Sequence, residues 1–327
     1  MLKWTATALA AAFVCSSAHA QERDKEPYCR WDEEEGINAA RLAVSDALLL
    51  EAETADAAAA LREHLPTGMP ARVGAPGQNE QLLAQEHFLT WYDDDLRSPL
   101  WVAYHFPAIE ADDQLGRLDS FRSDPRLREE NRSDCADYSE PIFDQGHMVP
   151  RAAMNRSGAA MDATFLMSNM TPQHCAFNRG PWQVLESIVR REWAGSQAHS
   201  WVVAGTVYDR NGDLVRDDDS AAWRMDGRRG RRVAIPSAQY MIVLRLGNSG
   251  FETLSFNLPN TDELISNDAV LEYLANHITT LDQIGQVTGF RFFEGLVVNE
   301  STSLWDTSDQ FRPSVLTSRC RASYPDY

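Results

Sequence analysis

Segments with strand-type composition alternate irregularly with helix-type segments after residue 72, and this order constrains the fold most. The strand-type segments, rich in aromatic and β-branched residues, cover residues 88–92, 100–106, 200–204, 238–246 and 252–257. The helix-type segments cover residues 181–193, 262–276 and 281–287. The strict strand–helix–strand rhythm of a doubly wound sheet is missing. We therefore predict an α+β fold in which helices flank a mixed or antiparallel central sheet.

Residues 1–20 have the composition of an export signal. Lys3 precedes a short apolar run over residues 5–14, and Ala18 and Ala20 place small residues where a signal peptidase reads the chain. The apolar run is too short to cross a bilayer. We expect cleavage after Ala20, which leaves a mature protein without a membrane span in the periplasm or outside the cell.

Residues 21–71 are predicted to form a helical extension ahead of the main domain. The stretch 32–65 is rich in Glu, Asp, Ala and Leu, which favours helix, and the Pro- and Gly-rich segment 66–77 marks a boundary. The extension could be an arm that packs on the domain, an element that binds a protein partner, or an inhibitory segment. The main domain is then expected over 72–300, followed by a loop-rich tail over 301–327.

Four cysteines remain after the expected cleavage, namely Cys29, Cys135, Cys175 and Cys320. An even number in an exported protein favours disulfides, although four cysteines allow three pairings. We favour Cys135 with Cys175, because each lies close to a motif described below, and Cys29 with Cys320. Free, buried thiols are the alternative.

The formal net charge of the chain is −18 at pH 7. Such acidity argues against broad, non-specific adhesion to nucleic acid, which depends on neutralising phosphates. It does not exclude an enzyme with a local cationic site. Positive charge comes almost wholly from arginine, because Lys3 and Lys25 are the only lysines.

The first segment with chemical potential covers residues 143–150. Gly146 permits close backbone approach, and Pro150 ends the strand, so that His147 is presented at an edge or turn. A neutral imidazole there could remove a proton from water, because its ordinary pKa lies near 6.5. The alternative is a hydrogen-bonded structural histidine.

The second segment covers residues 168–182 and leads into a helix. Pro181 suits the first turn of that helix, and Asn178 precedes it. The carboxamide oxygen of Asn178 is a hard ligand of the kind that suits Mg²⁺. Glu186 and Arg190 follow four residues apart on one helix face, where an ordinary surface salt bridge is the alternative. The adjoining apolar face, expected to pack on the sheet, consists of Trp182, Leu185, Val189 and Trp193.

Together these two segments resemble the DNA/RNA non-specific endonuclease family, the ββα-metal nucleases that include the Serratia-type nuclease and endonuclease G. The family pattern is a D-R-G-H box, an S-N-x-x-P-Q stretch and N-x-G-x-W before a helix with Glu and Arg. The matching stretches here are 144–147, 168–173 and 178–182, with Glu186 and Arg190 at the expected offsets. Framework segments in the family's order occur at 101–105, 203–208, 234–237 and 288–289. The resemblance thus covers about residues 72–300.

The resemblance implies a ββα-metal motif, in which two strands and one helix enclose a metal ion. His147 is implied as the general base that deprotonates water. Asn178 is implied as the only direct protein ligand of a hydrated Mg²⁺, which Mn²⁺ or another divalent cation could replace. Glu186 would orient a metal-bound water, Arg190 would contact the scissile phosphate, and the products would have 5′-phosphate ends. The predicted substrate-binding residues are Asp144, Gln145, Asn169 and Arg179.

One departure from the family pattern is Gln145, which replaces the Arg of the D-R-G-H box. A second phosphate-binding Arg, expected just before Phe121, also has no counterpart. Losing a charged hydrogen bond typically costs about 1.5–3 kcal/mol. We therefore expect a nuclease that is slower or that accepts a narrower range of substrates. Arginines that could compensate are Arg151, Arg156 and Arg179. A further cluster, which could follow a nucleic-acid backbone or form a solvated turn, comprises Arg228, Arg229, Arg231 and Arg232.

Three functions are compatible with these features. The leading one is an exported Mg²⁺-dependent endonuclease that acts on DNA, with RNA as a second substrate. The second is a metal-dependent phosphodiesterase for smaller nucleotides, which the acidic composition and Gln145 favour. The third is a catalytically weakened nuclease fold that binds a partner through residues 21–71, although the joint presence of all four motif residues argues against it. Zinc binding is not favoured, because paired Cys or His ligands are missing, and His174 and Cys175 are interpreted as loop residues.

Overall fold

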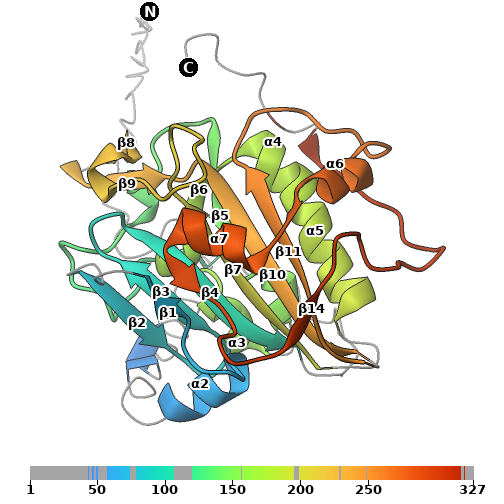
Figure 1. The fold of residues 1–327 in the computed structure, drawn as a ribbon. Coiled ribbons are helices and arrows are strands. Elements are labelled where there is room, and N and C mark those ends of the chain that lie inside the picture. The colour runs from blue at the N-terminus through green and yellow to red at the C-terminus, as the bar shows by residue number, and fades with distance from the viewer. Residues whose placement is uncertain are drawn as a thin grey trace, which may run out of the picture.

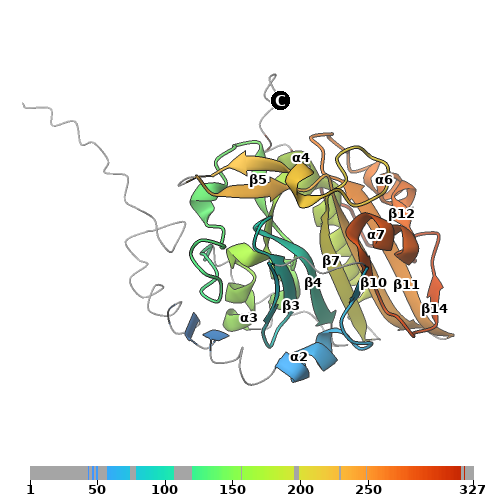
Figure 2. The same cartoon turned by 60° about the vertical axis from the view of Figure 1, so that its left-hand side comes forward.

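A central sheet with helices on both faces forms the body of the protein (Figure 1, Figure 2). The computed structural model describes residues 43, 46, 47, 49, 50, 57–73, 79–106, 120–155, 157–194, 199–227, 230–247, 249–317 and 320. The α+β fold with a mixed or antiparallel sheet, expected from the sequence, is confirmed.

The central sheet has eight strands in the order β12-β11-β10-β7-β4-β3-β2, with β14 paired to β11. All neighbours are antiparallel except β11 and β14. Its strands are β2 (Glu80–Ala84), β3 (Leu89–Asp93), β4 (Ser98–Phe106), β7 (Ser200–Val207), β10 (Ala238–Gly247), β11 (Gly250–Pro259), β12 (Ile278–Thr279) and β14 (Val298–Glu300). Three separate pairs are β1 (Ala71–Arg72) with β13 (Phe290–Arg291), β5 (Phe143–His147) with β6 (Met170–His174), and β8 (Trp223–Asp226) with β9 (Arg232–Ile235).

Alternate residues of the central strands face two hydrophobic cores, as the period of a β-strand requires. Val102 and Tyr104 of β4 face the core that contains α3, α5 and α6. Trp101 and Ala103 face the core that contains α2 and α7. The α-helices are α2 (Ala57–His64), α3 (Gly158–Ala163), α4 (Cys175–Phe177), α5 (Gln183–Ile188), α6 (Val270–Asn276) and α7 (Leu281–Thr288). The shorter or wider helical turns are η1 (Cys135–Asp137), η2 (Arg151–Met154), η3 (Met167–Asn169), η4 (Asn178–Trp182), η5 (Val189–Trp193) and η6 (Asp219–Ala221).

The five strands expected from the sequence are all present, with their ends shifted by a few residues, and α7 confirms the last helix. The prediction of a helix over 262–276 is wrong for its first half, because only α6 (Val270–Asn276) is helical in this stretch. The carbonyl oxygen of Ser266 accepts from the amides that open α6. The side chain of Asn267 accepts a 2.8 Å hydrogen bond from the Val315 amide. Polar side chains that bind backbone groups favour turns over helix.

The described part of the N-terminal extension is helical up to His64, whereas residues 65–70 form turns and Ala71 begins β1, so the helical prediction is wrong for this last stretch. The helical part comprises residues 43, 46, 47, 49 and 50 and helix α2, which contacts β2, β3 and β4. The expected signal over residues 1–20 and its cleavage site lie outside the described residues. Within the described part of the chain, no helix combines the length and apolar character needed to cross a membrane.

The C-terminal tail folds back onto the helix after β6, and this contact overturns the expected cysteine pairing. Cys175 is bonded to Cys320, so the predicted bond between Cys135 and Cys175 is wrong. The predicted pairing of Cys320 with Cys29, which lies outside the described residues, is wrong for the same reason. Close to the disulfide in sequence, the Leu316 amide donates a 2.7 Å hydrogen bond to the Arg179 carbonyl oxygen in η4, a second contact between the tail and this helix.

The described arginines between β8 and the start of β9 differ in their exposure to solvent. Arg231 is only 8 % exposed and forms ion pairs with Asp134 and Asp137 in the loop before β5. Both interpretations of this residue, as a solvated turn residue or a phosphate contact, are therefore wrong. Arg232 is exposed. Residues 228–229 lie outside the described residues.

Candidate active site

The pair of strands β5 and β6 contains the first sequence motif. Its register places Asp144 opposite Gln173 and His147 opposite Met170. His147 is the last residue of β5, and Pro150 leads into η2. The strand ends before Pro150, because the Met148 and Val149 amides donate instead to the backbone and side chain of Asn169. The imidazole is thus attached to the very end of a strand.

Gly146 is required for the two strands to approach each other. A Cβ atom at this position would overlap the side-chain carboxamide of Gln173 on β6. Gln173 is fully buried and has little room to move aside. A side chain at residue 146 would therefore push apart the strand that carries His147.

We expect Gly146→Ala to lower the free energy of unfolding by about 1–3 kcal/mol, the usual cost of overpacking. Gly158→Ala is the matched control, because no atom lies within 4 Å of a Cβ built there. We expect that variant to change stability by less than about 1 kcal/mol. Urea denaturation of both variants measures the difference, and equal midpoints would contradict this account of the strand pair.

The helix after β6 begins earlier than expected and is kinked. Cys175 opens α4 directly after His174, the last residue of β6, so neither is a loop residue. Gly180 adopts a non-helical conformation (φ −112°, ψ −115°), and Pro181, which has no N–H, follows it. Asn178 lies in η4, just before this kink. The kink sets the direction from which its side chain meets β5.

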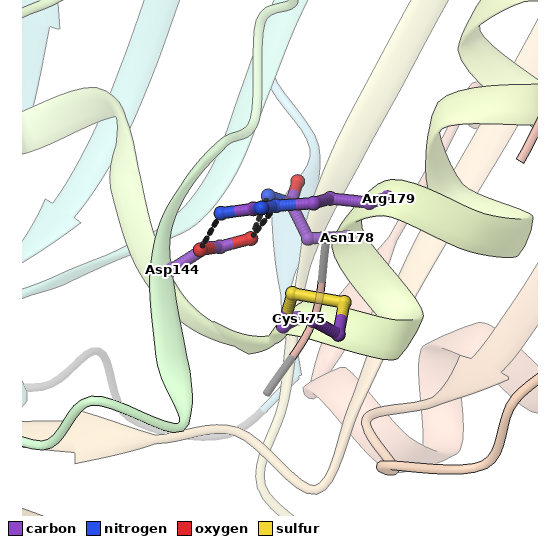
Figure 3. Close-up of a disulfide and its surroundings, with 5 residues drawn as sticks. Asp144, Cys175, Asn178 and Arg179 are labelled. Carbon is purple, nitrogen blue, oxygen red and sulfur yellow. Dashed lines mark hydrogen bonds and ion pairs between the residues drawn. A yellow bond between two sulfur atoms is a disulfide. The ribbon is translucent and has the colours of Figure 1, made fainter. Parts of the chain in front are cut away.

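Asp144 ties the kinked turn to β5 (Figure 3). Its carboxylate accepts a 2.8 Å hydrogen bond from Asn178 Nδ2. The same carboxylate accepts bonds of 2.8 and 2.7 Å from Nε and Nη2 of Arg179. Charged, two-pronged contacts of this kind are strong and geometrically specific. Asp144 thus fixes the position of both side chains.

The bond to Asp144 also fixes the orientation of the Asn178 carboxamide. An ionised carboxylate only accepts hydrogen bonds, so the NH₂ group must face Asp144. The amide oxygen, a hard ligand that suits Mg²⁺, lies on the side away from Asp144 (Figure 3). Among the described residues no cluster of three or more His, Cys, Asp or Glu could hold a metal ion. The oriented carboxamide oxygen of Asn178 fits a cation that keeps most of its water shell and takes one protein oxygen.

Aromatic side chains hold His147 from two sides. Its half-buried ring meets Phe121 edge to face, with centroids 5.6 Å apart, and meets Phe165 in the same way at 5.0 Å. The indole N–H of Trp182, in η4, donates to the carbonyl oxygen of His147 at 3.3 Å. The motif histidine and the helix that contains Asn178 are therefore in direct contact.

Asn169, expected to bind substrate, instead supports the backbone after His147. Its side chain accepts a 2.9 Å bond from the Val149 amide and donates to the carbonyl oxygens of Val149 and Thr164 at 3.0 and 2.9 Å. It is fully buried. No atom is left exposed for a substrate contact, so we assign Asn169 to positioning.

Glu186 and Arg190 lie one turn apart on the helix that follows the kink. Both are partly buried. Burial raises the pKa of Glu186 to about 8, while the Trp182 indole and the Arg190 charge act in the opposite direction. Burial and the Glu186 carboxyl together raise the pKa of Tyr104 on β4. The apolar face of the helix packs on the sheet as predicted, through Trp182, Leu185, Val189 and Trp193.

The high pKa of Glu186 has a consequence for stability. A carboxyl with a folded pKa of about 8 and an unfolded pKa near 4.3 binds more protons in the folded state between these values. The free energy of unfolding must therefore fall as pH rises through this window. We expect Glu186→Gln to remove this pH dependence. Between pH 5 and pH 8, its free energy of unfolding should rise by on the order of 2 kcal/mol relative to that of the wild type.

Urea denaturation in EDTA at several pH values tests this expectation. EDTA removes divalent cations, whose charge would lower the pKa of a nearby carboxyl. If the free energies of unfolding of the wild type and of Glu186→Gln depend on pH in the same way, the pKa of the Glu186 carboxyl is not raised in the folded protein.

The arginines proposed to compensate for Gln145 differ in their surroundings. Arg179 forms an ion pair with Asp144, and 35 % of its side chain is exposed. Arg151 lies half-buried in η2, after the strand that contains Gln145. Arg156 lies outside the described residues. Sequence reasoning also missed Phe121 and Phe165, because isolated phenylalanines outside a periodic pattern give no signal of a contact with His147.

Comparisons with known proteins show which family and which fold this chain resembles. The family model for DNA/RNA non-specific endonucleases matches residues 68–299. Nuclease C1 of Cunninghamella echinulata var. echinulata is 30% identical over 231 residues, which cover 69% of this chain and 88% of that protein. Mitochondrial endonuclease G of Homo sapiens is 27% identical over 70% of this chain and 75% of its own length. A chain from the crystal structure of the EndoG/EndoGI complex has a similar fold, with a TM-score of 0.57 and 22% identity over 72% of this chain and 92% of that one.

Proposed function

Because the chain belongs to the DNA/RNA non-specific endonuclease family, whose members hydrolyse nucleic acid with a metal ion, we propose that it is an exported Mg²⁺-dependent endonuclease. Its substrates are DNA and RNA, and its products have 5′-phosphate ends. One observation supports this most strongly. Asp144 orients the Asn178 amide so that its oxygen is free for a cation, beside the strand that ends in His147.

Each motif residue then has one chemical task. His147 accepts a proton from the attacking water, and the aromatic contacts hold its ring in position for that transfer. Asn178 provides the protein oxygen for the cation. A bound Mg²⁺ supplies positive charge that stabilises the phosphate and the leaving oxygen. Arg190 adds a fixed positive charge for the same phosphate.

Glu186 is suited to hold water next to the cation. Without a cation, burial keeps this carboxyl mostly neutral at pH 7, because it raises the pKa to about 8. With a divalent cation bound at Asn178, the Glu186 carboxyl would favour its ionised form, because opposite charges attract. The carboxylate then accepts hydrogen bonds from water and so orients it.

The test is cleavage of supercoiled plasmid by the mature protein, with Mg²⁺ and with EDTA. We expect nicking with Mg²⁺, none with EDTA, and recovery when Mg²⁺ is added back. End-labelling of the fragments should find 5′-phosphates. An inert protein across Mg²⁺, Mn²⁺ and Ca²⁺ would contradict the proposal.

A second function keeps the same site but has smaller phosphodiesters as substrates. The formal charge of −18 weakens binding to long polyanions, and Gln145 lacks the charge of an arginine. Parallel assays on plasmid, RNA and a dinucleotide distinguish the two functions. Faster turnover of the dinucleotide than of plasmid at equal phosphodiester concentration would favour the second.

A further inference from the structure

Phe121 packs against one side of the His147 ring. Phe121 contacts both His147 and Phe165, the latter with centroids 5.0 Å apart. These three rings meet edge to face, so a shift of one phenyl ring changes the space open to the imidazole. A general base must lie within hydrogen-bond reach of the proton it removes. The groups that anchor Phe121 therefore influence where the imidazole lies.

Arg122, the next residue, anchors this segment. Its amide donates to the Phe165 carbonyl oxygen at 3.3 Å, and its carbonyl oxygen accepts from Met167 at 2.8 Å. The guanidinium is fully buried. Its Nη1 donates to the backbone carbonyl oxygens of Ser120 and Asp162, at 3.2 and 3.0 Å. Backbone and side chain together hold Phe121 against Phe165.

The charge that balances Arg122 comes from the N-terminal extension. Arg122 Nε donates to Asp46 Oδ1 at 2.8 Å, and this is the only ion pair of Arg122 among the described residues. The neighbouring Asp124 is already bound by Arg126 through two nitrogens. Removing one partner of a buried ion pair leaves an uncompensated charge, which is strongly unfavourable. Without the Asp46 carboxylate, the buried guanidinium keeps two backbone acceptors, which do not balance its charge.

We propose that Asp46 is a positioning residue for the general base, acting through Arg122 and Phe121 on the His147 ring. This inference rests on the proposed function for its kinetic consequence only. The N-terminal extension is then a packing arm that completes the active site. Asp46 itself touches neither substrate nor reacting atoms.

The test compares Asp46→Asn with two other variants of the mature protein. Asp46→Asn should lower kcat for plasmid nicking about tenfold to hundredfold with KM unchanged, the effect of a misplaced catalytic group. Asp46→Glu should restore most of the rate, because it keeps the charge. Glu80→Gln is the matched control. It removes the buried ion pair of Arg72 and Glu80 at 2.6 Å, on edge strand β2, and should leave kcat unchanged.

A second readout does not depend on activity. The ring proton resonances of His147, assigned by their loss in His147→Ala, should shift or broaden in Asp46→Asn. Those of His277, which packs on Tyr273 in the region of α6, should stay in place. Circular dichroism at the assay temperature shows that each variant is folded. If Asp46→Asn is less stable, assays at lower temperature keep the comparison valid.

The outcomes separate this inference from the proposed function. Wild-type kcat and unchanged His147 resonances in Asp46→Asn would overturn the positioning role. Equal loss of kcat in Glu80→Gln would also overturn it, since the effect would then be a general loss of stability. An inactive wild-type enzyme would contradict the proposed function, while the His147 resonances would still test the positioning.

Discussion

Replacing His147 with alanine is expected to lower kcat for plasmid cleavage by about 10²- to 10⁴-fold, the range for loss of a general base. The fold should persist, because the ring is half-buried at the end of β5 and its backbone contact with Trp182 does not need the side chain. Initial rates at saturating Mg²⁺ measure the effect. The loss should appear in kcat, because the proton is transferred in the transition state.

His174→Ala is the matched control for this variant. His174 ends the partner strand β6 and packs on Phe143 with centroids 4.6 Å apart, so its truncation removes a similar ring from the same pair of strands. We expect its kcat to stay close to the wild-type value. Full activity of His147→Ala, or an equal loss in His174→Ala, would show that His147 is not the base.

The second large effect is expected for Asn178→Ala, which removes the proposed cation ligand. The Mg²⁺ concentration for half-maximal activity should rise by at least about 10- to 100-fold, the change seen when even an indirect partner of a metal is lost. Asp144 and Arg179 should stay paired, because their contact does not involve Asn178. Titration of activity with Mg²⁺ measures the shift.

Asn131→Ala is the control, because Asn131 also donates its amide to an aspartate, Asp94, at 2.6 Å, but in the loop before β5. Its Mg²⁺ dependence should match that of the wild type. Unchanged Mg²⁺ dependence in Asn178→Ala would exclude Asn178 as the ligand.

Local patterns predicted much of this structure. The aromatic and β-branched runs that became β3, β4, β7, β10 and β11 are long and regular. The two motifs lie in segments that the structure brings into contact, because the Trp182 indole donates to the His147 carbonyl oxygen. The catalytic roles of His147 and Asn178 stay predictions. The start of the helix was less predictable. The usual preference of Pro181 for a first turn was overridden by the kink at Gly180, which lets the helix begin at Cys175.

Contacts between distant segments could not be predicted from the sequence. The bond of Cys175 to Cys320 spans 145 residues and depends on how the tail returns. The burial of Asn169 depends on backbone groups that only the folded chain brings to it. The ion pair of Asp46 and Arg122 joins two segments with no motif in either. In each case the decisive partner is set by tertiary packing, which local propensity does not encode.

The most direct test of the central claim is a double-mutant comparison of His147→Ala, Asn178→Ala and the variant with both changes. Initial rates of plasmid nicking are measured for all three at one Mg²⁺ concentration that saturates the wild type but not Asn178→Ala, so that both single variants are slow. If the base and the cation ligand act on one phosphodiester, the double variant should be about as slow as the slower single variant, because residues that act as a unit are not additive. Rate losses that multiply in the double variant would mean that His147 and Asn178 act independently, and would contradict a shared site.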